Sequence, residues 1–186
     1  RDMKLLSLLV VVVLCAISSV DCGCYNENRI ISTPDNSKHV LCIQFKNSDC
    51  LHCKANGNYY KCDTKPAVNS NPAADKGPAP NGYYAIGAIY THGTHGISWA
   101  NLHPRKQNGN GWWNYYRANP DVPGSRSHIG LHPGRTSRGC VTVTGSYCWS
   151  NLESMLKSKT GDTITTTKRF WKTATVNRVG ILRVMN

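Results

Sequence analysis

The sequence predicts a mainly β fold of the α+β class with one short α-helix. Most of the chain consists of short apolar or β-branched segments separated by Gly, Pro and Asn, which are turn residues. A single segment carries a helix-start signal. Cysteines cluster in the N-terminal quarter and predict a disulfide-stapled part: Cys22, Cys24, Cys42, Cys50, Cys53 and Cys62.

Residues 1–18 have the pattern of a secretory signal peptide. Lys4 precedes an apolar run at 5–17, and Ala16 and Ser18 form a small-residue cleavage site. The run is too short to span a membrane. We therefore expect a secreted, extracellular protein without stable membrane insertion. Cleavage removes Cys15 from the nine cysteines, and the remaining even number favours full pairing in an oxidising compartment.

The expected elements follow from local patterns. Strands are expected at residues 29–33, 38–45, 83–90, 129–131, 141–144, 163–167 and 179–185. The Pro-rich stretch 63–80 predicts a loop or linker, and 101–124 predicts a long irregular segment. The helix is expected to begin at Ser150, because Ser150 and Glu153 form a capping box, and to end near Gly161.

Two domain organisations fit this pattern. We expect residues 19–186 to form a single domain whose first strands are the Cys-rich ones. The alternative is a separate Cys-rich module at 22–62, a linker at 63–80 and a second domain at 81–186. A Cys-x-x-Cys pair at 50–53 also occurs in zinc and redox sites, but a secreted chain without a second such pair favours disulfides.

The formal net charge of +12 predicts attraction to polyanions such as bacterial wall polymers. The basic residues form no dense run, so nucleic-acid binding is not expected.

Glu27 and Glu153 are the only glutamates, which leaves few candidates for a paired-carboxylate glycosidase. His92, His95 and His103 lack an evident acidic or cysteine co-ligand, so we expect no metal or other cofactor. We also expect a monomer.

The segment 127–141 carries the candidate chemistry. A short strand ends at His132, a turn containing Gly134 and Gly139 follows, and Cys140 opens the next strand. Two adjacent strands joined in this way can bring an imidazole within hydrogen-bond reach of a thiol. These are the minimum requirements for a cysteine nucleophile with a histidine base.

The residues around Cys140 fit that interpretation. Arg135 and Arg138 provide a positive setting that favours the thiolate. The backbone amides of Gly139 and Cys140 are candidate donors to an oxyanion. Ser137 is a candidate for orienting the turn through hydrogen bonds.

The pattern Ser-x-Gly-Cys-Val at 137–141, with His132 upstream, resembles the signature of the L,D-transpeptidase catalytic domain, also called the YkuD-like family. Pro-x-Gly-x-Tyr-x-Ile at 80–86 is similar to the start of a family strand. The resemblance covers about 77–164 and is greatest to secreted antibacterial effectors. It implies a β-sandwich or barrel with a short helix after the nucleophile strand.

The resemblance also implies an activity. Cys140 would attack a peptide carbonyl in a peptidoglycan stem with His132 as the base, and the acyl group would pass to an amine or to water. Such enzymes cross-link stems, exchange a terminal D-amino acid or hydrolyse. Peptidoglycan is therefore the expected partner, in an antibacterial role.

The substrate-binding residues are less uniform. Thr142 stands where the family often has Arg, so Arg126 and Arg138 become the candidates for holding the substrate carboxylate. Further candidates for substrate contact are His128, which alternates with His132 along the strand, and the two tryptophans of a Gly-rich segment, Trp112 and Trp113.

Two other functions remain open. A Cys140–Cys148 disulfide would account for both cysteines and fits a non-catalytic, cationic, disulfide-rich protein that binds microbial surfaces. If Cys140 is instead the nucleophile, Cys148 is the cysteine expected to lack a partner. A basic ribonuclease would need paired histidines with a lysine, for which His92, His95 and Lys106 are the candidates.

Overall fold

The computed structural model describes residue 24 and residues 38–71, 77–107, 113–116, 128–167 and 173–186. The expected signal peptide at 1–18 and the expected strand at 29–33 lie outside these described residues. No helix of the described part is both long and apolar enough to cross a membrane.

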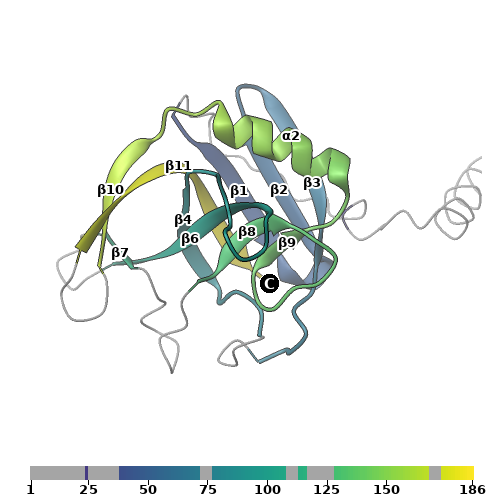
Figure 1. Ribbon diagram of the computed structural model, residues 1–186. Helices are drawn as coiled ribbons and strands as arrows, with labels where there is room; N and C mark the ends of the chain where they lie inside the picture. Colours follow the sequence, from purple (N-terminus) through teal and green to yellow (C-terminus); the bar gives the residue numbers. More distant parts are fainter. Residues whose placement is uncertain (1–23, 25–37, 72–76, 108–112, 117–127, 168–172) are drawn as a thin grey trace, which may run out of the picture.

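The described part is mostly β, with a single α-helix, which confirms the predicted fold class (Figure 1). The helix is α2 (Ser146–Lys157), and a short 3-10 helix, η1 (Lys46–Ser48), follows the first strand. The strands are β1 (Val40–Phe45), β2 (Cys50–Ala55), β3 (Asn58–Lys65), β4 (Gly82–Gly87), β5 (Tyr90–Thr91), β6 (Ser98–Gln107), β7 (Trp113–Tyr116), β8 (Gly130–Pro133), β9 (Val141–Val143), β10 (Asp162–Thr167) and β11 (Thr173–Met185).

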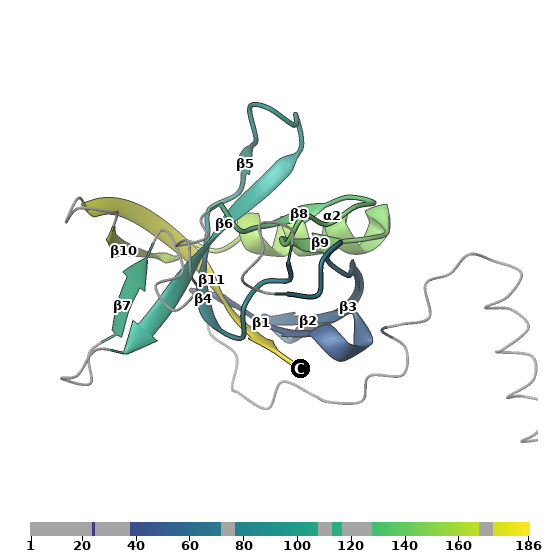
Figure 2. The same cartoon turned by 90° about the horizontal axis from the view of Figure 1, so that it is seen from below.

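The strands form one continuous sheet and not a barrel, which was one of the two expected forms. The order is β1-β2-β3-β9-β8-β6-β4-β11-β10-β7, with β5 paired to β6. The strands at the two ends of this order, β1 and β7, also pair with strands inside it. β1 pairs with β11, and β7 pairs with β6. The long strands β6 and β11 therefore connect all parts of the molecule (Figure 2).

The Cys-rich strands belong to the same sheet as the Cys140 segment. β1 runs parallel to β11, and β3 pairs with β9 at Thr64 and Val143. The disulfides are Cys24–Cys50, Cys42–Cys53 and Cys62–Cys148. The last of these joins β3 to α2 across 86 residues of sequence. The six N-terminal cysteines thus do not close among themselves, because one of them bonds outside the group.

The expectation of an irregular segment at 101–124 is wrong where the structure describes it. β6 continues to Gln107, and β7 pairs with it from Gln107 to Arg105. Pro104 and the polar neighbours of this strand mask its pattern in the sequence, since a proline normally argues against a strand interior. β6 tolerates it because its partners change along its length, from β8 to β4 to β7.

The helix begins one turn earlier than its capping box predicts. Gly145, at φ 73°, is the N-cap, and no side chain caps the first turn. Instead the Cys62–Cys148 disulfide holds that turn against β3, and Trp149 is buried. Glu153, expected at the cap, accepts a hydrogen bond of 2.7 Å from Ser98 Oγ on β6. Tertiary contacts have replaced the local start signal.

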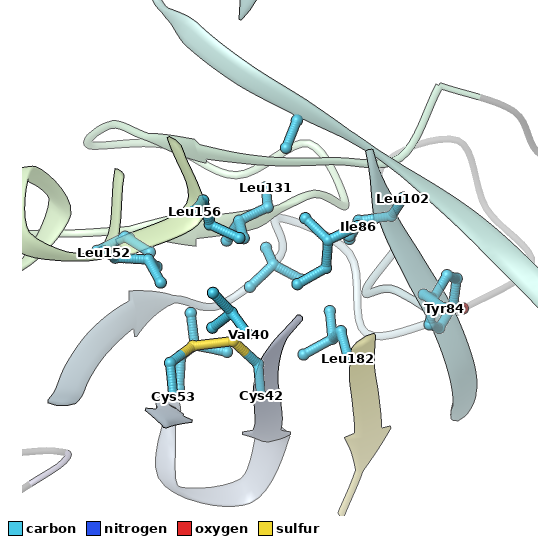
Figure 3. Close-up of a cluster of buried hydrophobic side chains, with 14 of the residues drawn as sticks. Val40, Cys42, Cys53, Tyr84, Ile86, Leu102, Leu131, Leu152, Leu156 and Leu182 are labelled. Carbon is cyan, nitrogen blue, oxygen red and sulfur yellow. A yellow bond between two sulfur atoms is a disulfide. The ribbon is translucent and has the colours of Figure 1, made fainter. Parts of the chain in front are cut away.

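The core lies between α2 with β8 on one side and β1, β2 and β11 on the other (Figure 3). Leu152 and Leu156 of α2 meet Leu131 of β8 and the Cys42–Cys53 disulfide of β1 and β2 in one buried cluster. Val141 and Val143 of β9 belong to the same cluster. Because side chains alternate along a strand, the residues between these lie on the other face of β8 and β9.

Candidate active site

The outer face of β8 and β9 carries the residues that the sequence singles out. The two strands are parallel, with Leu131 opposite Val141 and His132 opposite Thr142. Leu131 and Val141 point into the core, so His132 and Thr142 lie on the opposite face. Cys140 immediately precedes β9 and alternates onto that same face. His132 and Cys140 are thus diagonal neighbours across a strand pair.

Cys140 carries a thiol and stands outside the three disulfides among the described residues. The backbone N–H of Gly130, on the neighbouring strand, donates a hydrogen bond of 3.3 Å to Cys140 Sγ. The sulfur also lies 3.9 Å from the carbonyl oxygen of His128. The amide donor stabilises a thiolate at this sulfur, whereas the carbonyl acceptor stabilises the thiol.

Hydrogen bonds fix the tautomer of His132. Its Nδ1 lies 2.8 Å from the carbonyl oxygen of Pro133, and because a carbonyl can only accept, Nδ1 carries the proton. In the neutral ring Nε2 is then the acceptor, and the hydroxyl of Thr142 donates to it at 3.3 Å. The lone pair of a base therefore lies on Nε2, toward the Thr142 side of this face.

The surroundings of His132 also favour its neutral form. Burial is the largest cause that lowers its pKa below the ordinary value of 6.5. The carbonyl of Pro133 acts in the opposite direction, and the charges of His95 and His92 lower the pKa further. The net effect is a neutral imidazole at neutral pH, the form that can accept a proton.

Trp99 of β6 covers this imidazole. Its ring stacks on His132 with the centroids 4.6 Å apart and an angle of 5° between the planes. Gly130 makes room for the indole, since a Cβ at this position would lie 2.2 Å from the Trp99 ring. His92 and His95 of the β5–β6 hairpin also pack on Trp99, at centroid distances of 4.7 and 6.4 Å.

Sequence reasoning missed the roles of Trp99 and Gly130. A short strand that contains glycine between two candidate residues is a signal for close approach of another group, and it was available at Gly130. No sequence pattern near His132 or Cys140 indicates Trp99, because it belongs to β6, some thirty residues before Gly130 in the sequence. Thr142, noted only as a departure from the family pattern, contacts the His132 imidazole directly.

The turn before Cys140 is held by Ser137. Its hydroxyl donates to the carbonyl oxygen of Cys140 at 2.8 Å, and it accepts from the N–H of Gly139 at 3.3 Å. Ser137 is 1% exposed, so these bonds are shielded from water. The Gly139 amide is therefore engaged within the turn in this conformation, contrary to the expectation that it faces a developing oxyanion.

The other predicted site residues are placed less favourably. Arg135 and Arg138 are exposed on the turn. His128 is exposed at φ 62° and precedes β8, so it does not continue the His132 face as expected. Arg126 and Trp112 lie outside the described residues.

Trp113 lies on a different strand from the Cys140 segment. It opens β7, which pairs with β6 at Gln107. Gln107 is eight residues from Trp99, or roughly 26 Å at the rise of a β-strand. β7 lies at the opposite end of β6 from the β5 hairpin (Figure 2), and substrate contact by Trp113 stays a prediction.

The cysteine pairing decides one alternative. Cys148 is bonded to Cys62, so a Cys140–Cys148 disulfide is not formed, and the expectation that Cys148 lacks a partner is wrong.

Among the described residues, one group has possible metal-ligand atoms close enough together to hold an ion, namely Cys24, Cys50 and His52. Its two cysteines form a disulfide and offer no thiolates to an ion.

Comparisons with known proteins give little beyond this geometry. No family model matches the sequence, and no curated protein matches it. One similar solved structure is the L,D-transpeptidase (Yku) from Stackebrandtia nassauensis, with 12% identity, a TM-score of 0.41, and coverage of 86% of this chain and 62% of that one.

Another is the L,D-transpeptidase, residues 123–326, from Xylanimonas cellulosilytica DSM 15894. Its identity is 11% and its TM-score 0.36, with coverage of 84% of this chain and 65% of that one. This chain thus spans less than two thirds of the length of either protein. Because both TM-scores are below 0.5, we base no assignment of activity on these likenesses.

Proposed function

We propose that this chain is a cysteine-dependent enzyme that acts on the stem peptides of peptidoglycan, by acyl transfer or hydrolysis of the L,D-transpeptidase and L,D-carboxypeptidase type. One observation carries the proposal. The Cys140 thiol accepts a backbone N–H from Gly130 and shares a sheet face with a neutral His132 whose lone pair is on Nε2. The Ser-x-Gly-Cys-Val resemblance at 137–141 supports the choice of substrate.

The proposed reaction uses these groups in order. Rotation of the Thr142 hydroxyl frees Nε2 of His132, which takes the proton of the Cys140 thiol. The thiolate attacks a peptide carbonyl, forming a carbon–sulfur bond. The carbon–nitrogen bond then breaks as His132 returns the proton to the leaving amine. An amine or water attacks the thioester and releases Cys140.

The biological context is part of the proposal. A formal charge of +12 concentrates the protein on anionic bacterial envelopes. Three disulfides are typical of an oxidising, extracellular compartment. We infer a secreted monomer that binds bacterial peptidoglycan, with an antibacterial role. The non-catalytic alternative depends on Cys140 being in a disulfide, whereas Cys140 carries a thiol.

The test compares the products of peptidoglycan digestion. Purified sacculi are incubated with the wild type and with Cys140→Ala, and the muropeptides are separated by mass. We expect new or shortened stem products with the wild type and a loss of at least about a hundredfold in Cys140→Ala, because the nucleophile is removed.

The control is Tyr147→Ala, which changes a side chain that is 81% exposed on α2. Its profile should match that of the wild type. Muropeptide profiles that are identical with wild type and Cys140→Ala contradict the proposal.

A further inference from the structure

A cavity of about 270 Å³ opens beside Cys140. Apart from Cys140, its walls come from segments that the Ser-x-Gly-Cys-Val motif does not include. These are the end of β1, η1, the end of β3 and the stretch after it, the residues just before β4, and Asn186 after β11. The lining residues with functional groups include Gln44, Lys46, Asp49, Lys65 and Cys140. The Cys-rich strands therefore build one wall of the cavity that Cys140 lines.

Gln44 is a polar residue on the side of β1 that otherwise carries buried apolar side chains. It follows Val40 and Cys42 on the face of β1 that points into the core, and it is 7% exposed. Its Oε1 has no hydrogen-bond partner among the described residues. A buried acceptor without a donor costs free energy, and a ligand that brings an N–H group into the cavity removes that cost.

The charged side chains that line the cavity are those of Lys46, Lys65 and Asp49, and Asn186 lines it as well. Lys46 and Lys65 provide two ammonium groups against the single side-chain carboxylate of Asp49. Lys46 is half-buried, and burial lowers its pKa because water solvates the ammonium less well there. An anionic group entering the cavity compensates for this lost solvation.

We propose that this cavity binds a peptide segment with a free carboxylate and presents it to Cys140. Lys46 and Lys65 bind the carboxylate, and Gln44 Oε1 accepts a hydrogen bond from a peptide N–H. This assigns the carboxylate-binding role to lysines of the Cys-rich part rather than to Arg126 or Arg138. The identity of the bound peptide as a substrate rests on the proposed function of Cys140.

The cavity can be tested without turnover, through the thiol itself. Iodoacetate and iodoacetamide both alkylate a thiolate, forming a thioether and releasing iodide, but only iodoacetate is an anion. We expect the iodoacetate-to-iodoacetamide rate ratio at Cys140, normalised to that of free cysteine, to fall at least about threefold in Lys46→Gln/Lys65→Gln. Mass spectrometry of the Cys140 peptide measures both rates.

The matched control is Lys54→Gln/Lys61→Gln, which removes the same charge from lysines of β2 and β3 that do not line the cavity. Its rate ratio should stay at the wild-type value. An equal fall in both double variants assigns the effect to net charge and overturns the proposal. An unchanged ratio in Lys46→Gln/Lys65→Gln also overturns it.

A second measurement addresses Gln44. The dipeptide N-acetyl-L-alanyl-D-alanine and its C-terminal amide are compared as protectants of Cys140 against iodoacetamide. We expect the acid to protect more strongly than the amide in the wild type, and protection by the acid to weaken in Gln44→Leu and in Lys46→Gln/Lys65→Gln. Equal protection by both compounds contradicts carboxylate recognition.

The two proposals fail in different ways. If the wild type leaves peptidoglycan unchanged but Cys140 still prefers iodoacetate in a manner that depends on the lysines, the proposed enzyme function is wrong and the cavity assignment stands. If the wild type processes peptidoglycan but the iodoacetate-to-iodoacetamide rate ratio is the same in the wild type and in Lys46→Gln/Lys65→Gln, the cavity assignment is wrong.

Discussion

At the scale of single residues, the state of His132 depends on three neighbours from three strands. The Pro133 carbonyl selects the Nδ1–H tautomer, and Thr142 donates to Nε2. Trp99 stacks on the ring and excludes water from one side. The Cys140 site therefore depends on residues on β6 and β9 as much as on the imidazole itself.

The charges of His92 and His95 on the β5–β6 hairpin provide a prediction for this residue. They lower the pKa of His132, so the variant His92→Gln/His95→Gln should have a His132 pKa that is raised toward its ordinary value of 6.5. Burial, the largest cause, is unchanged, so the pKa should stay below 6.5. NMR titration of the His132 Cε1 proton measures the shift.

Salt provides the control. Added salt screens the charges of His92 and His95 but not the burial of His132. The pKa of His132 in the wild type should therefore rise with ionic strength, and in the double variant it should respond less. A titration curve that is the same in both proteins would show that the hairpin histidines do not act on the base.

At the scale of elements, Asp162 holds together the strands on the far side of the sheet. It opens β10 and lies opposite Arg178 of β11. The Nε of Arg178 donates a hydrogen bond of 2.7 Å to Asp162 Oδ1, and its Nη2 donates a second one to Oδ2. His39, just before β1, donates from Nε2 to Oδ1 at 2.9 Å. Arg178 also donates to the hydroxyl of Tyr115 on β7.

These bonds predict how stability depends on pH. The Arg178 hydrogen bond is the largest cause that lowers the pKa of Asp162, from 3.8 to about 2. Since the folded pKa is depressed, the stabilisation is complete above the unfolded value of 3.8 and is lost as pH falls toward 2.

Asp162→Asn should therefore lower the free energy of unfolding at pH 7. We expect a loss of about 1 kcal/mol, less than the nominal conversion of the pKa shift, because the side chain is 36% exposed and solvent screens the pair. Urea unfolding of both proteins at pH 7 and near pH 2 measures the difference. A difference of equal size at both pH values would mean that the ion pair is not its source.

At the scale of the whole molecule, the Cys-rich part and the Cys140 segment are joined in three ways. β1 pairs with β11, β3 pairs with β9, and Cys62 is bonded to Cys148. The cavity beside Cys140 also has walls from both parts. We propose that these two parts fold as one unit, in preference to a separate module at 22–62.

The Cys62–Cys148 disulfide tests this unity. It closes a long loop, so Cys62→Ala/Cys148→Ala should lose about 2–4 kcal/mol of unfolding free energy and still unfold in a single transition. Calorimetry measures both quantities. Cys140→Ala, which removes a cysteine outside the disulfides, is the control and should change stability by less than about 1 kcal/mol. Two separate transitions in the wild type would instead support independent modules.

Part of the fold was predictable from local pattern. Alternation and turn residues placed β1, β4, β8, β9 and β10 within a few residues of their observed bounds. Predictions failed where long-range contacts outweigh local signals. The helix start moved from Ser150 to Ser146, where the disulfide to β3 holds the first turn, and Pro104 concealed a strand that changes partners along its length.

The sequence by itself determined the fold class, the short strand–turn–strand that places His132 and Cys140 on one face, and Ser137 as the residue that holds the turn. Only the tertiary structure decided that Cys148 pairs with Cys62, that Trp99 covers His132, and that Lys46 and Cys140 line one cavity. The reason is physical. Alternation is a property of adjacent residues, whereas pairing, stacking and cavities join segments whose separation in sequence leaves no periodic trace.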